Sequence, residues 1–202
     1  MFEIVTSSRQ QKSFEEIWEY FCEMYGWYND PYAKNGIRYN LLLPQAERKV
    51  IGTIEFVPYK GKHPNSTVEN HFRFSRLKKI QQHQKRVWEI DKLCLHKDFQ
   101  RRGYFENFGE AFYHHAQTHK PKYYIAMMEK RFFRMMRILF GLNIIQVGQS
   151  IEMTGTSLIP VVCDMERIMQ NEEMVRVLFK KELKLKKADN KLYRLKRLFI
   201  KK

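Results

Sequence analysis

The feature that most constrains the possible fold of this chain lies at residues 86–119. There a predicted strand is followed by a glycine-containing loop and then by a predicted helix. The apolar-rich run RVWEIDKLCL predicts a buried central strand, and FENFGEAFYHHAQTH, at residues 105–119, has the apolar spacing of a helix. Between them lies QRRGY, in which Gly103 follows two arginines. The chain must turn at Gly103 and enter a helix whose first amides have no partner within the helix.

This loop has the chemistry of a phosphate-binding turn. Amides at the start of a helix point toward one place, glycine lets the backbone approach an anion, and Arg101 and Arg102 add positive charge. The alternative is an ordinary structural turn whose arginines face solvent. The sequence contains neither G-x-G-x-x-G nor G-x-x-x-x-G-K-[ST], which disfavours the nucleotide-binding folds that use those loops.

Helix-like and strand-like periods alternate along the rest of the chain. SFEEIWEYFCEMYGW predicts a first helix with Ser13 as its N-cap and Glu16 three residues later. A polar loop containing GKHPNS and a basic segment precede the central strand. The other expected elements are an antiparallel strand pair at 37–43 and 49–59, strands at 86–95 and 122–129, helices at 105–119 and 131–140, and a closing strand pair at 144–153 and 157–165. This order predicts one mixed α/β (α+β) domain over residues 1–166.

Length and cysteine usage favour a compact protein of a reducing compartment. The chain has 202 residues, of which 44% are apolar, enough for one domain with a sizeable core. Its three cysteines lie far apart without metal-binding spacing. There is no long uncharged apolar stretch, and MFEIVTSSRQQ lacks the layout of a signal peptide. We therefore expect a soluble, cytoplasmic protein.

The positive charge is concentrated at the C-terminus. The formal net charge is +15, and residues 180–202 hold eleven Lys or Arg against two acidic residues, a net of +9. Leucines and other apolar residues recur in this segment, so we expect residues 167–202 to form a basic helical extension. An acidic protein, a membrane surface and nucleic acid are its candidate partners, and a solvated helix that caps the domain is the alternative.

The loop resembles the Q/R-x-x-G-x-G/A loop of the GNAT (GCN5-related N-acetyltransferase) superfamily. The matching residues are Gln100, Arg101, Arg102, Gly103 and Tyr104. Phe105 follows them where the family usually has Gly or Ala. The resemblance covers residues 1–166 and implies a mixed, mostly antiparallel central sheet flanked by helices. It also implies that these six loop residues bind acetyl-CoA or another acyl-CoA, the acyl donor.

Three further stretches resemble the autoinducer-synthase and N-acyl amino acid synthase branch of that superfamily. VIGTIEFVP, VWEIDKLCL and LIPVVCDM are similar to its V-x-G-T-x-R-L-x-P, W-E-x-S-R-F-x-V and P-x-x-x-D-L patterns. Here Glu55 replaces the first arginine, and Asp91 with Lys92 replaces Ser-Arg, so a homoserine-lactone product is not implied. The branch also uses acyl carrier protein, and complementary charge between such acidic carriers and the basic C-terminal segment would speed their association.

The reaction implied by the resemblance is attack of a primary amine on an acyl thioester. An amine with a pKa of about 10.4 is only about one part in a thousand neutral at pH 7, an obstacle of roughly 4 kcal/mol unless a base removes the proton. Glu89 and Asp91 lie two apart on the central strand and therefore share a face. We expect Glu89 to be the base, directly or through water, and Asp91 to hold the acceptor or modulate the pKa of Glu89.

One alternative concerns the two carboxylates, and a separate expectation concerns the backbone that follows them on the strand. The carboxylates of Glu89 and Asp91 could instead be neutralised by neighbouring Lys and Arg. The backbone around Leu93, Cys94 and Leu95 is expected to pair with pantetheine and to donate a hydrogen bond to the oxyanion.

Neither a general acid nor a metal is assigned. Arg137 occupies the position at which many family members have a tyrosine acid, and a thiol pKa near 8.5 makes the thiolate a tolerable leaving group. His115 and His119 have the i, i+4 spacing of a metal pair, but no third ligand is evident.

The sequence therefore predicts an N-acyltransferase that moves an acetyl or longer acyl group from acyl-CoA or acyl carrier protein to a small-molecule primary amine. Three alternatives stay open: an autoinducer-synthase-like N-acyl amino acid synthase, a diverged acyl-CoA-binding protein without turnover, and a basic nucleic-acid-associated module. A homodimer is a further hypothesis.

Overall fold

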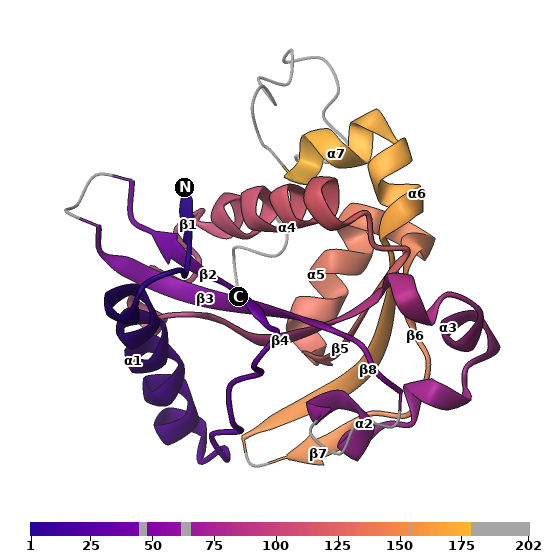
Figure 1. Cartoon of the computed structure of the whole chain (residues 1–202), viewed down its shortest axis with the longest axis horizontal. Coiled ribbons are helices and arrows are strands. Elements are labelled where there is room, and N and C mark those ends of the chain that lie inside the picture. The colour runs from indigo at the N-terminus through magenta and orange to yellow at the C-terminus, as the bar shows by residue number, and fades with distance from the viewer. Residues whose placement is uncertain (45–47, 62–65, 154, 179–202) are drawn as a thin grey trace.

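Eight strands form one sheet within residues 1–44, 48–61, 66–153 and 155–178, the residues that the computed structural model describes. The strand order is β1-β2-β3-β4-β5-β8-β6, with β7 also beside β8 (Figure 1). The strands are β1 (Phe2–Ile4), β2 (Ile37–Leu42), β3 (Val50–Pro58), β4 (Val87–Leu95), β5 (Tyr123–Glu129), β6 (Ile144–Gln146), β7 (Ile151–Met153) and β8 (Thr156–Asp164). Every described pair is antiparallel except β4 with β5, which confirms the mixed, mostly antiparallel sheet.

Helices cover both faces of this sheet (Figure 1). The helices are α1 (Ser8–Tyr25), α2 (Thr67–His71), α3 (Lys78–Gln82), α4 (Phe105–His119), α5 (Lys130–Phe140), α6 (Met165–Gln170) and α7 (Glu172–Leu178). Separate apolar clusters lie under α1, under α2 and α3, and between the sheet and the pair α4 and α5. None of the described helices has the length and hydropathy needed to cross a bilayer.

The boundaries expected around the central loop are confirmed. The strand β4 ends at Leu95 and the helix α4 covers Phe105–His119, as the sequence predicts. The helix α5 also ends where expected, because Gly141 follows it with a φ of 57°, in the left-handed region that favours glycine. The predicted pair at 37–43 and 49–59 is β2 with β3, in antiparallel register.

One expectation about local structure is wrong, one is confirmed in part, and one segment contains helices that the sequence analysis did not assign. The N-cap of α1 is Ser7, which forms a reciprocal capping box with Gln10, so Ser13 lies inside the helix. The run 144–153 is two short strands, β6 and β7, which pair separately with β8. The basic segment that follows the GKHPNS loop contains α2 and α3, which bury Val68 and Ile80.

The C-terminal part of the domain is continuous with its core. The helix α6 crosses the boundary expected at residue 166, and Ile168 within it is only 1% exposed. The helix α7 lies beside α4 (Figure 1). Residues 179–202, which contain most of the expected basic helical extension, lie outside the described residues.

The core between the sheet and α4 is built from stacked rings. The ring of Phe56 on β3 stacks on that of His115 on α4, with centroids 4.0 Å apart, and it also packs against Phe112 and Tyr124. Burial lowers the pKa of His115 far below its usual range, so this imidazole is neutral in the folded protein. These contacts fix α4, and therefore the loop before it, against the middle of the sheet.

Phe56→Ala is expected to lower the free energy of unfolding by about 3–5 kcal/mol, because it leaves a cavity where Phe56 is fully buried. Urea denaturation followed by tryptophan fluorescence measures the change. Ile138→Ala is the control, since Ile138 is 57% exposed and its removal should change stability by less than about 0.5 kcal/mol. Equal effects of the two substitutions would contradict this description of the core.

Candidate active site

The two parallel strands at the centre of the sheet separate after three residue pairs. Val87–Glu89 on β4 pairs with Tyr123–Ile125 on β5, and neither strand is paired with the other beyond that point. Yet β4 continues to Leu95 against β3, and β5 continues to Glu129 against β8. The facing edges of β4 and β5 thus carry backbone groups without a ladder partner in the middle of the sheet, where such groups require hydrogen bonds. We call this opening the fork.

A bulge in β4 lies just past the fork. Thr53 faces Cys94 and Glu55 faces Asp91, so the single residue between them on β3 is opposite both Lys92 and Leu93. Lys92 has a φ of 47°, in the left-handed region, and its amide donates to Asp91 Oδ1 at 2.8 Å. A bulge of this kind bends the strand and changes the direction of its side chains. It therefore accompanies the divergence of β4 from β5.

The loop between β4 and α4 presents free amides. Within the described part of the chain, the amides of residues 101–104 donate no hydrogen bond to a backbone or side-chain acceptor. Gly103 has a φ of 89°, and a Cβ added there would meet no atom within 4 Å. Glycine is thus required by its dihedral angle and not by crowding. Arg101 and Arg102 are exposed, and neither forms an ion pair with a described residue.

Side chains around the loop hold it against the end of β4. The Gln100 amide donates from Nε2 to the Leu95 carbonyl at 2.9 Å, which places Gln100 on the open edge of β4. On the other edge, the His96 amide donates to the Ile51 carbonyl at 2.8 Å. The His96 ring also stacks on Tyr20 of α1, with centroids 4.4 Å apart. The side chain of Gln100 thus positions the loop, and its Nε2 group is already engaged in the hydrogen bond to Leu95.

The two aromatic residues of the loop pack against other rings. Tyr104 contacts Phe99 with centroids 5.8 Å apart. Phe105 is half-buried, with its ring 6.3 Å from that of Phe132 on α5 and 6.5 Å from that of Phe108 on α4. The Phe105 ring is therefore directed toward the core, and it is the backbone of this residue that borders the loop.

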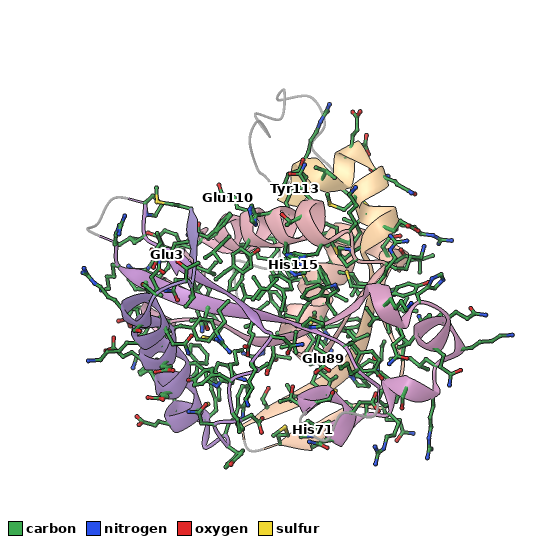
Figure 2. All side chains as sticks on the ribbon, in the orientation of Figure 1. Glu3, His71, Glu89, Glu110, Tyr113 and His115 are labelled. Atoms are coloured by element: carbon green, nitrogen blue, oxygen red, sulfur yellow. The ribbon has the colours of Figure 1, made fainter. Side chains whose placement is uncertain are left out.

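Glu89 lies at the fork, as the last β4 residue that is paired with β5. It is 3% exposed and lies between the sheet and α2 (Figure 2). The Ser66 hydroxyl donates to Glu89 Oε1 at 2.8 Å, and Glu89 has no ion pair among the described residues. Burial raises the pKa of Glu89 to about 7, the hydrogen bond from Ser66 opposes this shift, and the charge of Asp91 adds to it. This carboxylate can exchange a proton near neutral pH.

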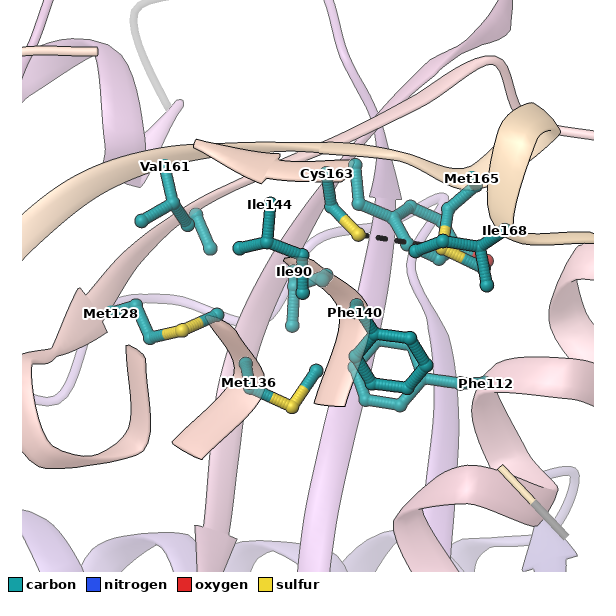
Figure 3. A pocket seen from close by; sticks show the side chains of 12 residues that line it. Ile90, Phe112, Met128, Met136, Phe140, Ile144, Val161, Cys163, Met165 and Ile168 are labelled. Carbon is teal, nitrogen blue, oxygen red and sulfur yellow. Dashed lines mark hydrogen bonds between the residues drawn. The ribbon is translucent and has the colours of Figure 1, made fainter. Parts of the chain in front are cut away.

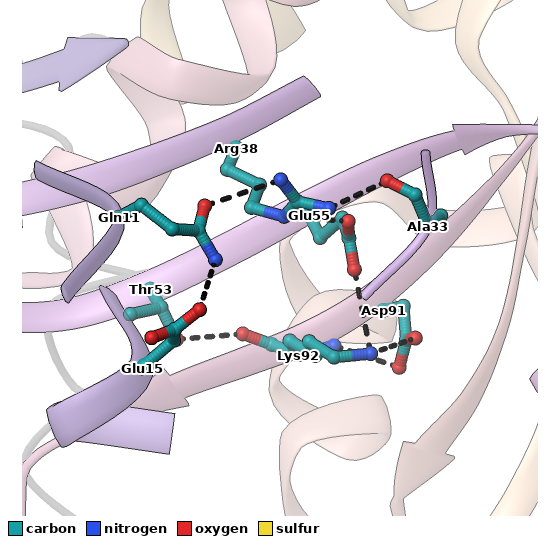
Figure 4. A network of polar contacts seen from close by, with 8 residues as sticks. All are labelled: Gln11, Glu15, Ala33, Arg38, Thr53, Glu55, Asp91 and Lys92. Atoms are coloured by element: carbon teal, nitrogen blue, oxygen red, sulfur yellow. Dashed lines mark hydrogen bonds and ion pairs between the residues drawn. The ribbon is translucent and has the colours of Figure 1, made fainter. Parts of the chain in front are cut away.

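Asp91 belongs instead to a buried network of charges (Figure 4). Lys92 Nζ lies 2.8 Å from Asp91 Oδ2 and 3.3 Å from Glu55 Oε2, and the Lys92 side chain is 1% exposed. Arg38 Nε lies 2.8 Å from Glu55 Oε1. Burial lowers the pKa of Lys92, but Asp91 and Glu55 outweigh it and raise the pKa above its usual value. The neutralisation of a carboxylate by neighbouring cations, expected as an alternative, thus occurs at Asp91.

The remaining strand residues of the predicted site have different surroundings. The Cys94 thiol lies 3.1 Å from Thr53 Oγ1 in the core under α1, and burial raises its pKa to about 12, so it is no nucleophile. Leu93 and Leu95 are half-buried and belong to the open part of β4 beyond the fork. Of Leu93, Cys94 and Leu95, only Leu95 has its carbonyl held on the open edge of β4, by the hydrogen bond from Gln100.

A small apolar cavity lies on the α5 side of the fork (Figure 3). Its volume is about 20 Å³, roughly that of one water molecule. Ile90 and Ala126, the first residues of β4 and β5 past the fork, contribute to its lining. The other lining residues are Phe112, Tyr124, Met128, Met136, Phe140, Ile144, Val161, Cys163, Met165 and Ile168. Three of these are methionines, whose flexible side chains can rearrange around a ligand.

Arg137 and the histidines of α4 have structural partners. Arg137 Nη1 donates to the Ile144 carbonyl at 2.9 Å, which ties α5 to β6. His115 Nδ1 lies 2.6 Å from the hydroxyl of Tyr124, and the His115 ring stacks on His119. No group of three His, Cys, Asp or Glu able to hold a metal occurs among the described residues.

Sequence reasoning missed two contributors to this site. Ser66 lies in a stretch interpreted as a polar loop, although Ser66 and Glu69 in STVE form an N-cap signal that could have identified α2. Arg38 was not singled out, because nothing in the sequence indicates that β2 and β3 bring it to Glu55.

The fold is that of known acyltransferases of the GNAT class. The AHL synthase LasI matches with a TM-score of 0.65 and 10% identity over 89% of this chain and 94% of LasI. FeeM, an N-acyl amino acid synthase from uncultured soil microbes, matches with a TM-score of 0.62 and 12% identity over 85% of this chain and 94% of FeeM. BjaI is a CoA-dependent acyl-homoserine lactone synthase whose structure was solved with SAM and isopentyl-CoA. It matches with a TM-score of 0.60 and 12% identity over 88% of this chain and 87% of BjaI.

At this level of identity the likeness shows the fold alone, and the chain therefore has the GNAT fold. No protein-family model and no curated protein sequence matches the chain.

Lys92→Met is expected to lower the free energy of unfolding by about 3–5 kcal/mol, because it leaves the Glu55 and Asp91 carboxylates without the cation between them. Lys130→Met is the control, since Lys130 is exposed. Chemical denaturation measures the free energy of unfolding of both variants. If Lys92→Met lowers it no more than Lys130→Met does, the charge network contributes little to stability.

Proposed function

We propose that this protein is an N-acyltransferase that moves an acyl group from a phosphopantetheine thioester to a primary amine. The observation that carries the proposal is the fork, which leads from the free amides of residues 101–104 to Glu89. The GNAT fold supports it, as does the similarity to BjaI, whose structure contains isopentyl-CoA.

The donor would lie along the fork. Its phosphates would accept hydrogen bonds from the amides of residues 101–104, while Arg101 and Arg102 contribute positive charge. Pantetheine contains two amide groups, which would pair with the unpaired edges of β4 and β5 as an added strand does. The thioester would then reach the point where Glu89 and Ile125 form the last strand pair.

Glu89 would act as the general base at that point. Its carboxylate takes a proton from the ammonium group of the acceptor, directly or through a water molecule. The neutral amine then attacks the thioester carbonyl, the C–N bond forms, the C–S bond breaks, and the thiolate leaves and is protonated. Because the pKa of Glu89 is raised to about 7, this carboxylate is a better proton acceptor than an ordinary glutamate and is still largely ionised above pH 7.

The acyl group would point toward the cavity lined by Ile90 and Ala126. An acetyl group needs little space there. A longer acyl chain would require the methionines of the lining to rearrange, because the cavity holds only about 20 Å³. We therefore infer an acetyl or longer acyl group, with acyl-CoA as the simplest donor.

Exposed cations near the mouth of the fork favour an acidic carrier protein as a second donor. The helix α5 begins directly after β5, and the contact between Phe105 and Phe132 places its first turn beside the loop. Lys130, Arg131 and Arg134 are exposed on α5, and none is paired with a described acidic residue. Complementary charge of this kind speeds association with an acidic partner.

The acceptor would approach from the face that carries α1 and α2. Asp91 lies there on the same face as Glu89, and burial raises the pKa of Asp30, with the nearby charge of Asp91 adding to the shift. The carboxylate of Asp30, which has no ion pair among the described residues, would attract a small-molecule amine in its ammonium form. Because FeeM, with the same fold, is an N-acyl amino acid synthase, amino acids are the first acceptors to test.

One observation favours a second candidate, a protein that binds acyl-CoA without turnover. Arg137 supports β6 at the position where many GNAT members have a tyrosine acid, and Phe105 replaces the small residue that ends the usual loop. Binding of acyl-CoA without release of thiol, over a panel of primary amines, would favour this candidate.

Glu89→Gln is expected to lower kcat/KM for thiol release about 10²–10⁴-fold, because the amide cannot accept the proton. In the native protein kcat/KM should rise with pH through about 7 as Glu89 loses its proton, and this rise should be absent from the variant. Asp98→Asn, which alters an exposed carboxylate near the loop, is the control. Unchanged rates in Glu89→Gln would remove Glu89 from its proposed role.

The double variant Arg131→Glu/Arg134→Glu is expected to raise KM for an acyl carrier protein thioester at least about tenfold at low salt. KM for the matching acyl-CoA should change less than about twofold, because neither residue belongs to the loop at 101–104. Steady-state assays with both donors provide the comparison. An equal change for the two donors would contradict a carrier-protein surface on α5.

A further inference from the structure

We propose that Ser66 is a positioning residue that holds Glu89 in its ionised form and in one orientation at the fork, so that the N-cap of α2 controls the proton acceptor. This inference rests on the proposed function of Glu89 and concerns a residue outside the loop and outside β4. It makes the N-cap of α2 part of the machinery for proton transfer.

The geometry gives Ser66 a dual role. Its hydroxyl donates to Glu89 Oε1 at 2.8 Å and accepts from the amide of Glu69 at 3.3 Å, which caps α2. Ser66 is 4% exposed and Glu89 is 3% exposed, so water does not readily replace this hydrogen bond. The hydroxyl proton is therefore directed at the carboxylate while the lone pair serves the helix.

The chemistry of this contact favours the charged state of Glu89. A hydroxyl donor stabilises a carboxylate more than a carboxylic acid, and Glu89 has no ion pair among the described residues to do so. Burial acts in the opposite direction and raises the pKa of Glu89. Ser66, together with the backbone of Val68, which acts in the same direction, thus sets how much of the base is ionised near neutral pH.

A second buried carboxylate in the same region has its own donors. Glu69 accepts from the hydroxyl of Tyr59 at 2.6 Å, and from the amide and the hydroxyl of Ser75 at 2.8 Å and 2.9 Å. Ser75 thus makes the same type of contact as Ser66, but to Glu69, which acts on Glu89 through its charge and not through a hydrogen bond. Ser75→Ala is therefore a matched control that removes a serine hydroxyl without altering the contact to Glu89.

The experiment compares Ser66→Ala, Ser66→Gly and Ser75→Ala with the native chain. Ser66→Gly is included because glycine is tolerated at an N-cap and separates loss of the cap from loss of the donor. In both Ser66 variants the rise of kcat/KM with pH should move upward by about one unit, which lowers kcat/KM about tenfold at pH 6 and leaves it unchanged above about pH 9. Ser75→Ala should keep the native profile.

A second measurement does not depend on turnover. In protein labelled with ¹³C at the glutamate carboxyl carbons, the resonance missing from Glu89→Gln identifies Glu89, and its titration should move upward in Ser66→Ala and Ser66→Gly. A titration unchanged in both variants would overturn the role of Ser66, even if Glu89→Gln abolishes activity. If the titration moves but no amine is acylated by the native chain, Ser66 keeps its role and the proposed acyl transfer fails.

Discussion

The separation of β4 from β5 after Glu89 and Ile125 is the constraint on which the rest of the site depends. Interrupting a sheet at its centre leaves backbone donors and acceptors that need partners. Past Glu89 neither strand supplies them to the other, although Gln100 donates to the Leu95 carbonyl. A ligand with amide groups of its own satisfies them better than a purely apolar one. The loop with free amides lies at the far end of the same opening, where a phosphorylated carrier would place its anionic end.

The buried charges under α1 show how this chain departs from the sequence patterns it resembles. Glu55 and Asp91 replace an arginine and a serine of those patterns, and both meet Lys92, which stands in the place of another arginine, in one network with Arg38. The two acidic replacements are therefore paired with cations of the same network. Because this network occupies the face on which an acceptor would approach, it gives a physical reason to expect a different acceptor.

Most of the fold could be predicted from the local pattern of apolar residues and glycines. The site could be predicted only in part. The spacing of apolar residues set the bounds of α4, and the glycines at 103 and 141 marked real turns in the left-handed region. Ser13 misled because Ser7, six residues earlier, forms the better capping box with Gln10. The fork, the bulge at Lys92 and the contact of Ser66 with Glu89 could not be predicted, because each arises from pairing between distant segments.

If the proposed function holds, a phosphopantetheine carrier occupies the fork with its phosphates on the loop. The most direct measurement is an amide NMR titration with coenzyme A, which reports binding without requiring turnover. Saturable shifts are expected at the amides of residues 101–105 and along the open edge of β4 up to Leu95. Saturable shifts confined to other parts of the chain, with the loop amides unmoved, would contradict this placement of the carrier.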